Sequence, residues 1–253
     1  MKLSRKAKPW VGLAALMALA YFGYALLVGL NQRSFLYFPT HESADTPLRP
    51  WVVKGEIVGY CRVVAQPRTV WLMTHGNGGQ ADGRSYVLRR MSGADSLYVL
   101  EYPGYGLRAG SPSRESFDRA ALAAYQALRE EFPRTPVCVL GESLGSGPAA
   151  YLASTSQPPD KIVLVVPFDS LASVASDHMP LLPVRAMLQD NWDNIAALKS
   201  YAGPIEIYGA IDDRIIGIEH ARNLAAHLRA AKFTALDGGH NDWSNSERVR
   251  IER

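Results

Sequence analysis

Short apolar runs alternate with amphipathic stretches along most of the chain, and this alternation restricts the possible folds more than any other feature. Continuous apolar runs are typical of strands that are buried on both faces of a parallel sheet. Stretches such as 114–131 and 218–231 carry apolar residues at helical spacing, and Ser113 is suited to cap the first. The pattern predicts an α/β fold with a mostly parallel, doubly wound sheet that binds ligands at the carboxyl ends of its strands. The expected strands are 70–73, 97–100, 137–140, 162–166, 205–208 and, less clearly, 233–236.

The limits of the domain also follow from the pattern. Residues 51–65 predict two antiparallel edge strands ahead of the parallel ones. The segment 169–204 interrupts the alternation; its prolines and a short apolar helix expected at 184–188 predict a small cap. No repeat or second domain is evident. We therefore divide the chain into a basic tail (1–9), an apolar helix (10–30), a linker (31–49) and an α/β domain (50–253).

The strongest chemical signal is the segment 141–145, GESLG, which lies between the strand expected at 137–140 and a small-residue helix expected at 147–153. In this context G-x-S-x-G predicts a tight turn that exposes the hydroxyl of Ser143 above the sheet, with helical N–H groups nearby for a developing oxyanion. The overlapping G-x-G-x-x-A spacing at 145–150 matches a dinucleotide fingerprint. Pro148 within that loop and the lack of a matching acid argue against this alternative.

A serine nucleophile needs a base, and the base needs an acid that orients it. His240 is the predicted base because it lies in a glycine-rich loop after the last expected strand. Asp212 or Asp213, which follow the preceding strand, can supply the acid, and Asp169 is a third candidate. The remaining histidines are expected in structural, cap or solvent-exposed positions: His41, His75, His178, His220 and His227.

A second glycine-rich turn, THGNGG at 74–79, follows the strand expected at 70–73. Such a turn lets backbone N–H groups point at a substrate oxygen. We therefore predict an oxyanion hole formed by the N–H groups of Asn77 and of Leu144, the residue after the nucleophile. His75 is then expected to hold the loop in place.

These motifs, in this order, resemble the α/β-hydrolase superfamily over residues 50–248, which implies the α/β-hydrolase fold. The matching segments are HGNGG, GESLG and DGGHND, and EYPGYG at 101–106 is similar to the family's D-Y-R-G-Y-G segment. The family spacing places the acid three residues past Gly209, which implies Asp212. Glu101 and Pro103 depart from the family pattern, which has Asp and Arg there.

The finer pattern is similar to a membrane-associated subgroup of this family, because FLYFPT (35–40) follows the apolar helix and GHND surrounds the histidine. That subgroup includes acyl-protein thioesterases that remove palmitoyl groups, so the resemblance implies an acyl ester or thioester substrate. Tyr208 stands where the subgroup often has histidine, and this departure weakens any transfer of substrate specificity.

Residues 10–30 carry no charge, and a helix of this length spans about 30 Å, the thickness of the hydrocarbon core of a bilayer. The positive-inside rule predicts a cytoplasmic N-terminus and an extracytoplasmic domain, periplasmic in a bacterium. We expect an uncleaved signal anchor; a signal peptide cleaved at Ala18-Leu19-Ala20 is the alternative. The basic residues that precede the helix are Lys2, Arg5, Lys6 and Lys8.

Composition excludes several other classes. The chain is 47% hydrophobic and 20% charged, which is enough apolar material for a full core and argues against a disordered protein. Its net charge of +3 is concentrated in the basic tail, so no nucleic-acid partner is predicted. Cys61 and Cys138 cannot form a disulfide framework or an all-cysteine zinc site, although export would permit one bond between them. We expect neither metal nor cofactor.

Together these features predict a monomeric, membrane-anchored serine hydrolase that cleaves carboxylic esters or thioesters of small or lipid-like acyl substrates. A serine peptidase or amidase, an acyltransferase and a non-catalytic hydrolase-fold binding protein are the alternatives. The last is disfavoured because all three triad residues have candidates. Six apolar residues of the cap are candidates for an acyl pocket: Leu171, Met179, Leu181, Leu182, Met187 and Leu188.

Overall fold

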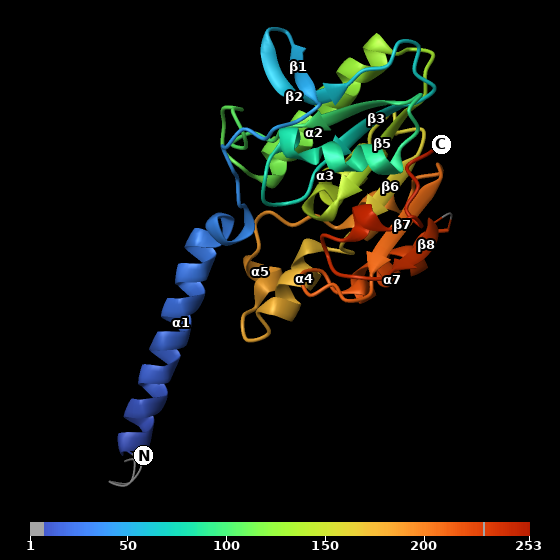
Figure 1. Ribbon diagram of the computed structural model, residues 1–253. Coiled ribbons are helices and arrows are strands. Elements are labelled where there is room, and N and C mark those ends of the chain that lie inside the picture. Colours follow the sequence, from blue (N-terminus) through green and yellow to red (C-terminus); the bar gives the residue numbers. More distant parts are fainter. Residues whose placement is uncertain (1–7, 230) are drawn as a thin grey trace.

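The computed structural model describes residues 8–229 and 231–253, so Lys2, Arg5 and Lys6 of the basic tail lie outside the described residues. Eight strands form one sheet in the order β1-β2-β4-β3-β5-β6-β7-β8 (Figure 1). β1, β2 and β4 pair antiparallel, and all pairs from β4 to β8 are parallel. The strands are β1 (Arg49–Val53), β2 (Glu56–Arg62), β3 (Val70–Thr74), β4 (Ser96–Leu100), β5 (Val137–Glu142), β6 (Ile162–Val165), β7 (Ile205–Ala210) and β8 (Ala231–Leu236).

Every apolar run singled out in the sequence falls in a strand of this sheet, apart from Val166. Residues 51–65 contain most of β1 and all of β2; both strands pair antiparallel as expected, but only β1 of the two is an edge strand. This confirms the predicted fold class. The helices are α1 (Lys8–Leu36), α2 (Arg114–Glu131), α3 (Ser146–Ala153), α4 (Leu171–His178), α5 (Val184–Met187), α6 (Asn194–Leu198) and α7 (Ile218–Ala226), with 3-10 segments η1 (Ala81–Arg90), η2 (Ser143–Gly145) and η3 (Trp243–Asn245).

The sheet is buried on both faces, as its unbroken apolar strands require. In β3, for example, Val70 and Leu72 belong to one core cluster, whereas Trp71 and Met73 belong to the other. Helices α2, α3 and α7 supply side chains to the first cluster, and η1 and the C-terminal segment supply side chains to the second.

Two helix boundaries illustrate what sets the ends of these elements. Ser113 caps α2 as predicted: its hydroxyl accepts a bond from the N–H of Ser116, and the Ser116 hydroxyl accepts one from Ser113 (both 3.0 Å). In contrast, α7 ends at Ala226, earlier than the predicted residue 231, because Ala231 already pairs with Ile205 as the first residue of β8.

Cys61 and Cys138 are both free and buried. They lie on β2 and β5, and β4 and β3 run between these strands. Three inter-strand spacings separate them by about 14 Å, which is beyond the reach of a disulfide. The sheet topology therefore excludes the bond that export would have permitted.

The segment between β6 and β7 contains α4, α5 and α6, and we call residues 169–204 the cap. Helix α1 extends away from the domain as a long rod, and its C-terminal end lies beside α4 and α5 (Figure 1). It continues past the predicted end at residue 30 to Leu36. Its last turns bind the cap, where Arg33 Nε lies 2.8 Å from Asp190 Oδ2 and Gln32 Oε1 accepts the N–H of Gln189 at 2.7 Å.

His220 of α7 is buried and not solvent-exposed, in contrast to the expectation from the sequence. Its Nδ1 lies 2.9 Å from Asp169 Oδ1 at the end of β6, and its Nε2 lies 3.0 Å from Asp177 Oδ2 of α4. Carboxylates only accept, so both ring nitrogens carry protons in this arrangement. The hydrogen bond to Asp169 raises the pKa of His220, against the opposing effect of burial. Asp169, the third candidate for the catalytic acid, is thus committed to the contact between cap and α7.

This cluster predicts a pH-dependent contribution to stability. Because the pKa of His220 is raised in the folded state, its contribution is fully present below the unfolded value of about 6.5 and is lost as the pH rises through the folded value. We expect His220→Gln to lower the free energy of unfolding by about 1–2 kcal/mol at pH 6, and by less at pH 9. His227→Gln, at an exposed position beyond the same helix, is the control. If His220→Gln lowered the free energy of unfolding by the same amount at pH 6 and pH 9, the protonated His220 would not be the source of the stabilisation.

Candidate active site

Ser143 lies at the turn where β5 ends and the helical segment begins. Its φ of +51° is in the left-handed region, which costs a residue other than glycine about 1–3 kcal/mol. The flanking glycines are required by close approach: a Cβ on Gly141 would lie 2.7 Å from the Cβ of Ala149, and one on Gly145 would overlap the carbonyl oxygen of Thr74. The two glycines of the G-x-S-x-G pattern therefore have a steric origin.

His240 and an aspartate complete a hydrogen-bonded chain with this serine. His240 lies in the loop after β8, and its Nε2 is 2.8 Å from Ser143 Oγ. Its Nδ1 is 2.7 Å from Asp213 Oδ2. With Nδ1 as donor to the carboxylate, Nε2 carries the lone pair that can accept the serine proton.

The aspartate that contacts His240 is Asp213 and not Asp212, the residue that the family spacing implies. After β7 the chain keeps pairing with the β8 side, since the N–H of Ile211 binds Leu236 O and that of Asp212 binds Gly238 O. The side chains of Ile211 and Asp212 remain exposed on this extension, and Asp213 is the first residue after it that is buried. The family spacing, which places the acid three residues past Gly209, does not include the two paired residues Ile211 and Asp212.

Asp213 is held rigidly. Its Oδ1 accepts the backbone N–H groups of Ile215 and Ile216, each at 2.8 Å, while Oδ2 faces His240. The side chain of Asp213 is fully buried. A carboxylate with both oxygens engaged cannot rotate freely, so it fixes the plane of the imidazole ring.

The THGNGG turn lies against the same site. Asn77, Ser143 and Leu144 together line a cavity of about 400 Å³. The side chain of Asn77 is committed elsewhere: its Oδ1 accepts the N–H of Phe38 at 3.0 Å, and its Nδ2 donates to Leu36 O. Only its backbone N–H is left to face a substrate oxygen in the way we predicted for the pair Asn77 and Leu144.

His75 is fully buried behind this turn. Its Nδ1 lies 2.8 Å from the carbonyl oxygen of Gly76, and its ring centroid is 4.4 Å from that of Tyr102. The hydroxyl of Tyr102 donates to the carbonyl oxygen of His75 at 2.8 Å. These contacts fit the structural role expected for His75.

Sequence analysis gave no role to Glu142, which the structure places at the centre of a buried network. Its Oε1 accepts bonds from the Tyr86 hydroxyl (2.6 Å) and Trp243 Nε1 (2.8 Å). Its Oε2 accepts the N–H of Gly76 (3.0 Å) and lies 3.6 Å from Arg84 Nη1. One carboxylate thus connects the turn at Ser143, the THGNGG turn and the segment that follows His240.

Glu142 is held in its charged form. Burial acts to raise the pKa of Glu142, but Arg84 and the bonds from Tyr86, Gly76 and Trp243 outweigh it and leave the pKa below its usual value. A signal was present in the sequence, because an acid two residues after the apolar run 137–140 must find partners when it is buried. Which partners it finds depends on η1 and η3, two segments that sequence analysis did not identify.

The cavity beside Ser143 is mainly apolar, and its polar side chains are Asn77, Ser143 and His178. Its wall includes residues from the end of α1 and from the cap, among them Leu36, Leu171 and Met179. Of the six cap residues proposed for an acyl pocket, Leu171 and Met179 line this cavity; Leu182, Met187 and Leu188 line a neighbouring groove, as does Met179; and Leu181 is exposed. Within residues 8–229 and 231–253, no group of three or more potential ligands is placed to hold a metal ion.

Comparisons with known proteins agree with this architecture, although no protein-family model matches the chain. The uncharacterized protein Rv2307c of Mycobacterium tuberculosis is 32% identical over 260 residues, covering 96% of this chain and 91% of that protein. The lysophosphatidylserine lipase ABHD12 of Danio rerio is 28% identical over 189 residues, covering 67% of this chain and 49% of that protein.

The fold itself is similar to that of the Pyrococcus furiosus esterase Pf2001, with a TM-score of 0.61 and 12% identity over 82% of this chain and 95% of that one. The sheet order, the turn at Ser143 and the extensive match to the mycobacterial protein lead to one assignment. The chain belongs to the α/β-hydrolase superfamily and shares a family with the Mycobacterium tuberculosis protein Rv2307c.

Proposed function

We propose that this protein is a membrane-anchored serine hydrolase that cleaves carboxylic esters or thioesters of acyl substrates. The observation that carries the proposal is the chain of short contacts from Ser143 Oγ through His240 to Asp213, 2.8 Å and 2.7 Å long. Ser143 lines a mainly apolar cavity of about 400 Å³, a volume within the size range of small-molecule sites.

The proposed reaction follows from these positions. His240 Nε2 takes the proton of Ser143 as Oγ attacks the acyl carbonyl, and Asp213 stabilises the resulting imidazolium. The N–H groups of Asn77 and Leu144 bind the oxyanion. The imidazolium then gives its proton to the leaving alkoxide or thiolate, and a water activated by His240 hydrolyses the acyl-enzyme.

Two further observations support a lipid-like acyl group. The cavity wall is built mainly of aliphatic and aromatic side chains, which suit a hydrocarbon chain better than a peptide. A relative that matches two thirds of this chain is named a lysophosphatidylserine lipase, an enzyme of an ester-linked lipid.

We also propose that α1 anchors the protein in a membrane, with its N-terminus in the cytoplasm and the catalytic domain outside, as a monomer. The segment Trp10–Leu36 is long and apolar enough to cross a bilayer, and only 6% of its most apolar window is buried. A core helix of that length would bury one face. Exposed apolar residues along this rod call for a lipid environment.

Replacing the nucleophile tests the first proposal. We expect Ser143→Ala to abolish labelling by a fluorophosphonate probe and to lower ester turnover at least about 10⁴-fold, because the attacking oxygen is lost. Ser154→Ala, at an exposed position after α3, is the control. Membrane and soluble fractions compared on a gel will also give the mass of the labelled wild type. A folded wild type that is not labelled would favour the non-catalytic binding protein, and label at a reduced mass would favour a cleaved signal peptide.

The choice of acid is tested by paired substitutions. Asp213→Asn should lower kcat by about 10²–10⁴-fold, because the amide no longer holds the imidazole in the required tautomer. Asp212→Asn should change kcat less than about twofold, since its side chain is exposed. Steady-state kinetics on a p-nitrophenyl ester measure both. A large loss in Asp212→Asn with little loss in Asp213→Asn would restore the assignment from family spacing.

The Glu142 network is tested by a double-mutant cycle. Glu142→Gln leaves Arg84 buried without its charge partner and should lower the free energy of unfolding by about 3 kcal/mol, with a fall in kcat as the loops that carry Gly76 and Trp243 loosen. The double variant Arg84→Met/Glu142→Gln should recover part of that stability, because no unpaired charge remains. Additive losses measured by urea unfolding would show that the two residues act independently.

A further inference from the structure

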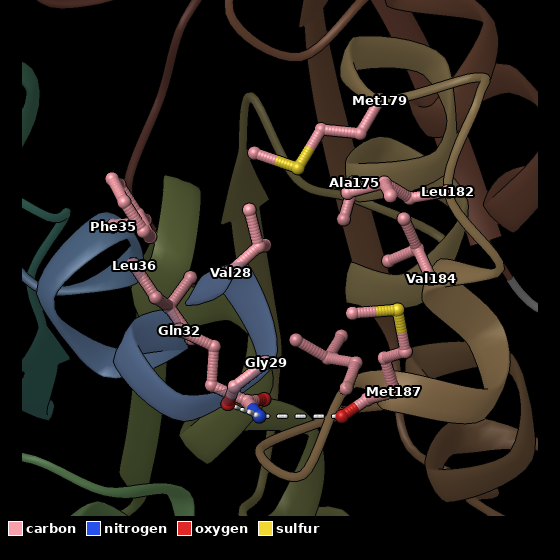
Figure 2. Close-up of a pocket in the computed structure, with 11 residues that line it drawn as sticks. Val28, Gly29, Gln32, Phe35, Leu36, Ala175, Met179, Leu182, Val184 and Met187 are labelled. Carbon is pink, nitrogen blue, oxygen red and sulfur yellow. Dashed lines mark hydrogen bonds between the residues drawn. The ribbon is translucent and has the colours of Figure 1, made fainter. Parts of the chain in front are cut away.

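An apolar groove lies between the C-terminal part of α1 and the cap helices α4 and α5 (Figure 2). Val28 and Gly29 of α1 face Leu182, Val184 and Met187 of the cap across it. Its volume is about 100 Å³. It is a shallow, hydrocarbon-lined channel, and the anchor helix itself is one of its walls.

Gln32, the one amide side chain in this wall, has no free polar atom to present to the groove. Its Nε2 donates to Gly29 O (2.8 Å) and to Met187 O (3.2 Å), and its Oε1 accepts the N–H of Gln189 (2.7 Å). The contact with Met187 O crosses the end of the groove in Figure 2, whereas the contact with Gly29 O stays within α1. A groove whose polar atoms are all bonded internally suits an alkyl chain and offers nothing to a polar ligand.

The groove adjoins the cavity beside Ser143. Four residues line both spaces, two from the end of α1 and two from the cap: Phe35, Leu36, Ala175 and Met179. Along α1 the path from Val28 to Leu36 is about 12 Å long. An alkyl chain in the groove therefore lies end-on to the cavity in which its carbonyl would meet the serine.

The mouth of the groove lies at the outer edge of the hydrocarbon, because a span of about 20 residues that begins at Trp10 ends near Gly29. A span that begins at Trp10 needs about 20 residues and therefore includes Tyr21, which lies about 17 Å from Trp10, near the bilayer midplane. The Tyr21 hydroxyl donates to the carbonyl oxygen of Leu181 at the tip of the cap, at 2.9 Å. This contact places Leu181, at the tip of the cap, within the outer half of the bilayer. It also pairs the Tyr21 hydroxyl with the Leu181 carbonyl, as polar groups in a lipid environment require.

The residues around the groove have the polarity expected at these depths. Leu181 is 82% exposed, which is costly in water and favourable in lipid. Between Met179 and Gln189 the one charged residue is Arg185, whose long side chain can extend toward the headgroups. The ion pair of Arg33 and Asp190 lies at the domain end of the groove, where the span meets water.

We propose that the groove is an entry channel for the acyl chain of a bilayer lipid, which slides between α1 and the cap and reaches Ser143 without crossing water. The inference rests on the proposed hydrolase function and deepens it, since it makes the anchor helix a part of the acyl-binding site. The occupant is the hydrocarbon chain of an ester or thioester lipid in the same leaflet as the cap.

Two glycines of α1 provide a matched test in the full-length protein. A Cβ on Gly29 would lie 3.5 Å from Met187 Cε across the groove, whereas a Cβ on Gly23 would meet no atom within 4 Å. In lipid nanodiscs, we expect Gly29→Phe to lower kcat/KM for p-nitrophenyl palmitate at least tenfold and to leave the butyrate ester within twofold of wild type. Gly23→Phe should leave both esters unchanged.

A second variant, on the cap wall of the groove, keeps the test valid if Gly29→Phe does not fold. Met187→Trp fills the groove from the cap side at a residue that does not line the cavity, and should give the same selective loss of palmitate turnover, with fluorophosphonate labelling retained. Equal losses for both esters in both variants, or an unchanged palmitate-to-butyrate ratio, would overturn the channel while leaving the hydrolase intact. Failure of wild type to hydrolyse either ester in a Ser143-dependent way would instead overturn the proposed function.

An experiment in proteoliposomes tests whether the substrate's acyl chain enters from the bilayer or through water. A palmitoyl ester of a fluorogenic alcohol is placed either in the vesicles that carry the enzyme or in separate vesicles of the same lipid. Entry from the bilayer predicts rapid hydrolysis in the shared vesicles and at least tenfold slower hydrolysis in the separate ones, with Gly29→Phe removing the advantage. Equal rates in the two arrangements would show that the substrate arrives through water.

Discussion

The turn at Ser143 is the constraint on which the rest of the structure depends. A residue other than glycine is held at a φ of +51°, between two glycines that leave no room for a side chain. Such a turn persists only when its surroundings over-determine it. The buried carboxylate of Glu142, adjacent to the serine, supplies part of that support, because it binds Gly76 of one loop and Trp243 of another. The turn at Ser143, the THGNGG turn and the segment after His240 are thus joined through the carboxylate of Glu142.

Most of the fold could be predicted from the sequence, because its signals are local. Unbroken apolar runs such as 137–140 and the capping serine at 113 are each set by neighbours within a few residues, and the structure has elements at these places. Ser143 and His240 were also identifiable, since their glycine-rich contexts require particular backbone geometry. Elements and turns that depend on residues within one short segment can therefore be predicted from one sequence.

Features that depend on two distant segments were not predictable in this way. The choice of Asp213 over Asp212 follows from two additional hydrogen bonds between the chain after β7 and the β8 side, which no local pattern records. His220 has the spacing of a solvent-facing helical residue, but the cap covers it and supplies Asp177. Glu142 likewise obtains its partners from η1 and η3. In each case the deciding partner lies tens of residues away, in a loop whose path the sequence does not specify.

The end of α1 and the segment that follows it are bonded to the loops beside Ser143. Asn77 of the oxyanion turn binds Leu36 O and the N–H of Phe38 with its side chain, and the N–H of Gly106 binds Thr40 O at 2.8 Å. The end of the anchor helix is therefore bonded directly to the loop that is proposed to hold the oxyanion. A shift of α1 relative to the domain would break these bonds and open the cavity wall at Leu36. The position of α1 and the geometry of the turn at Asn77 are therefore coupled by these bonds, before the chain goes on to join the sheet at its edge as β1.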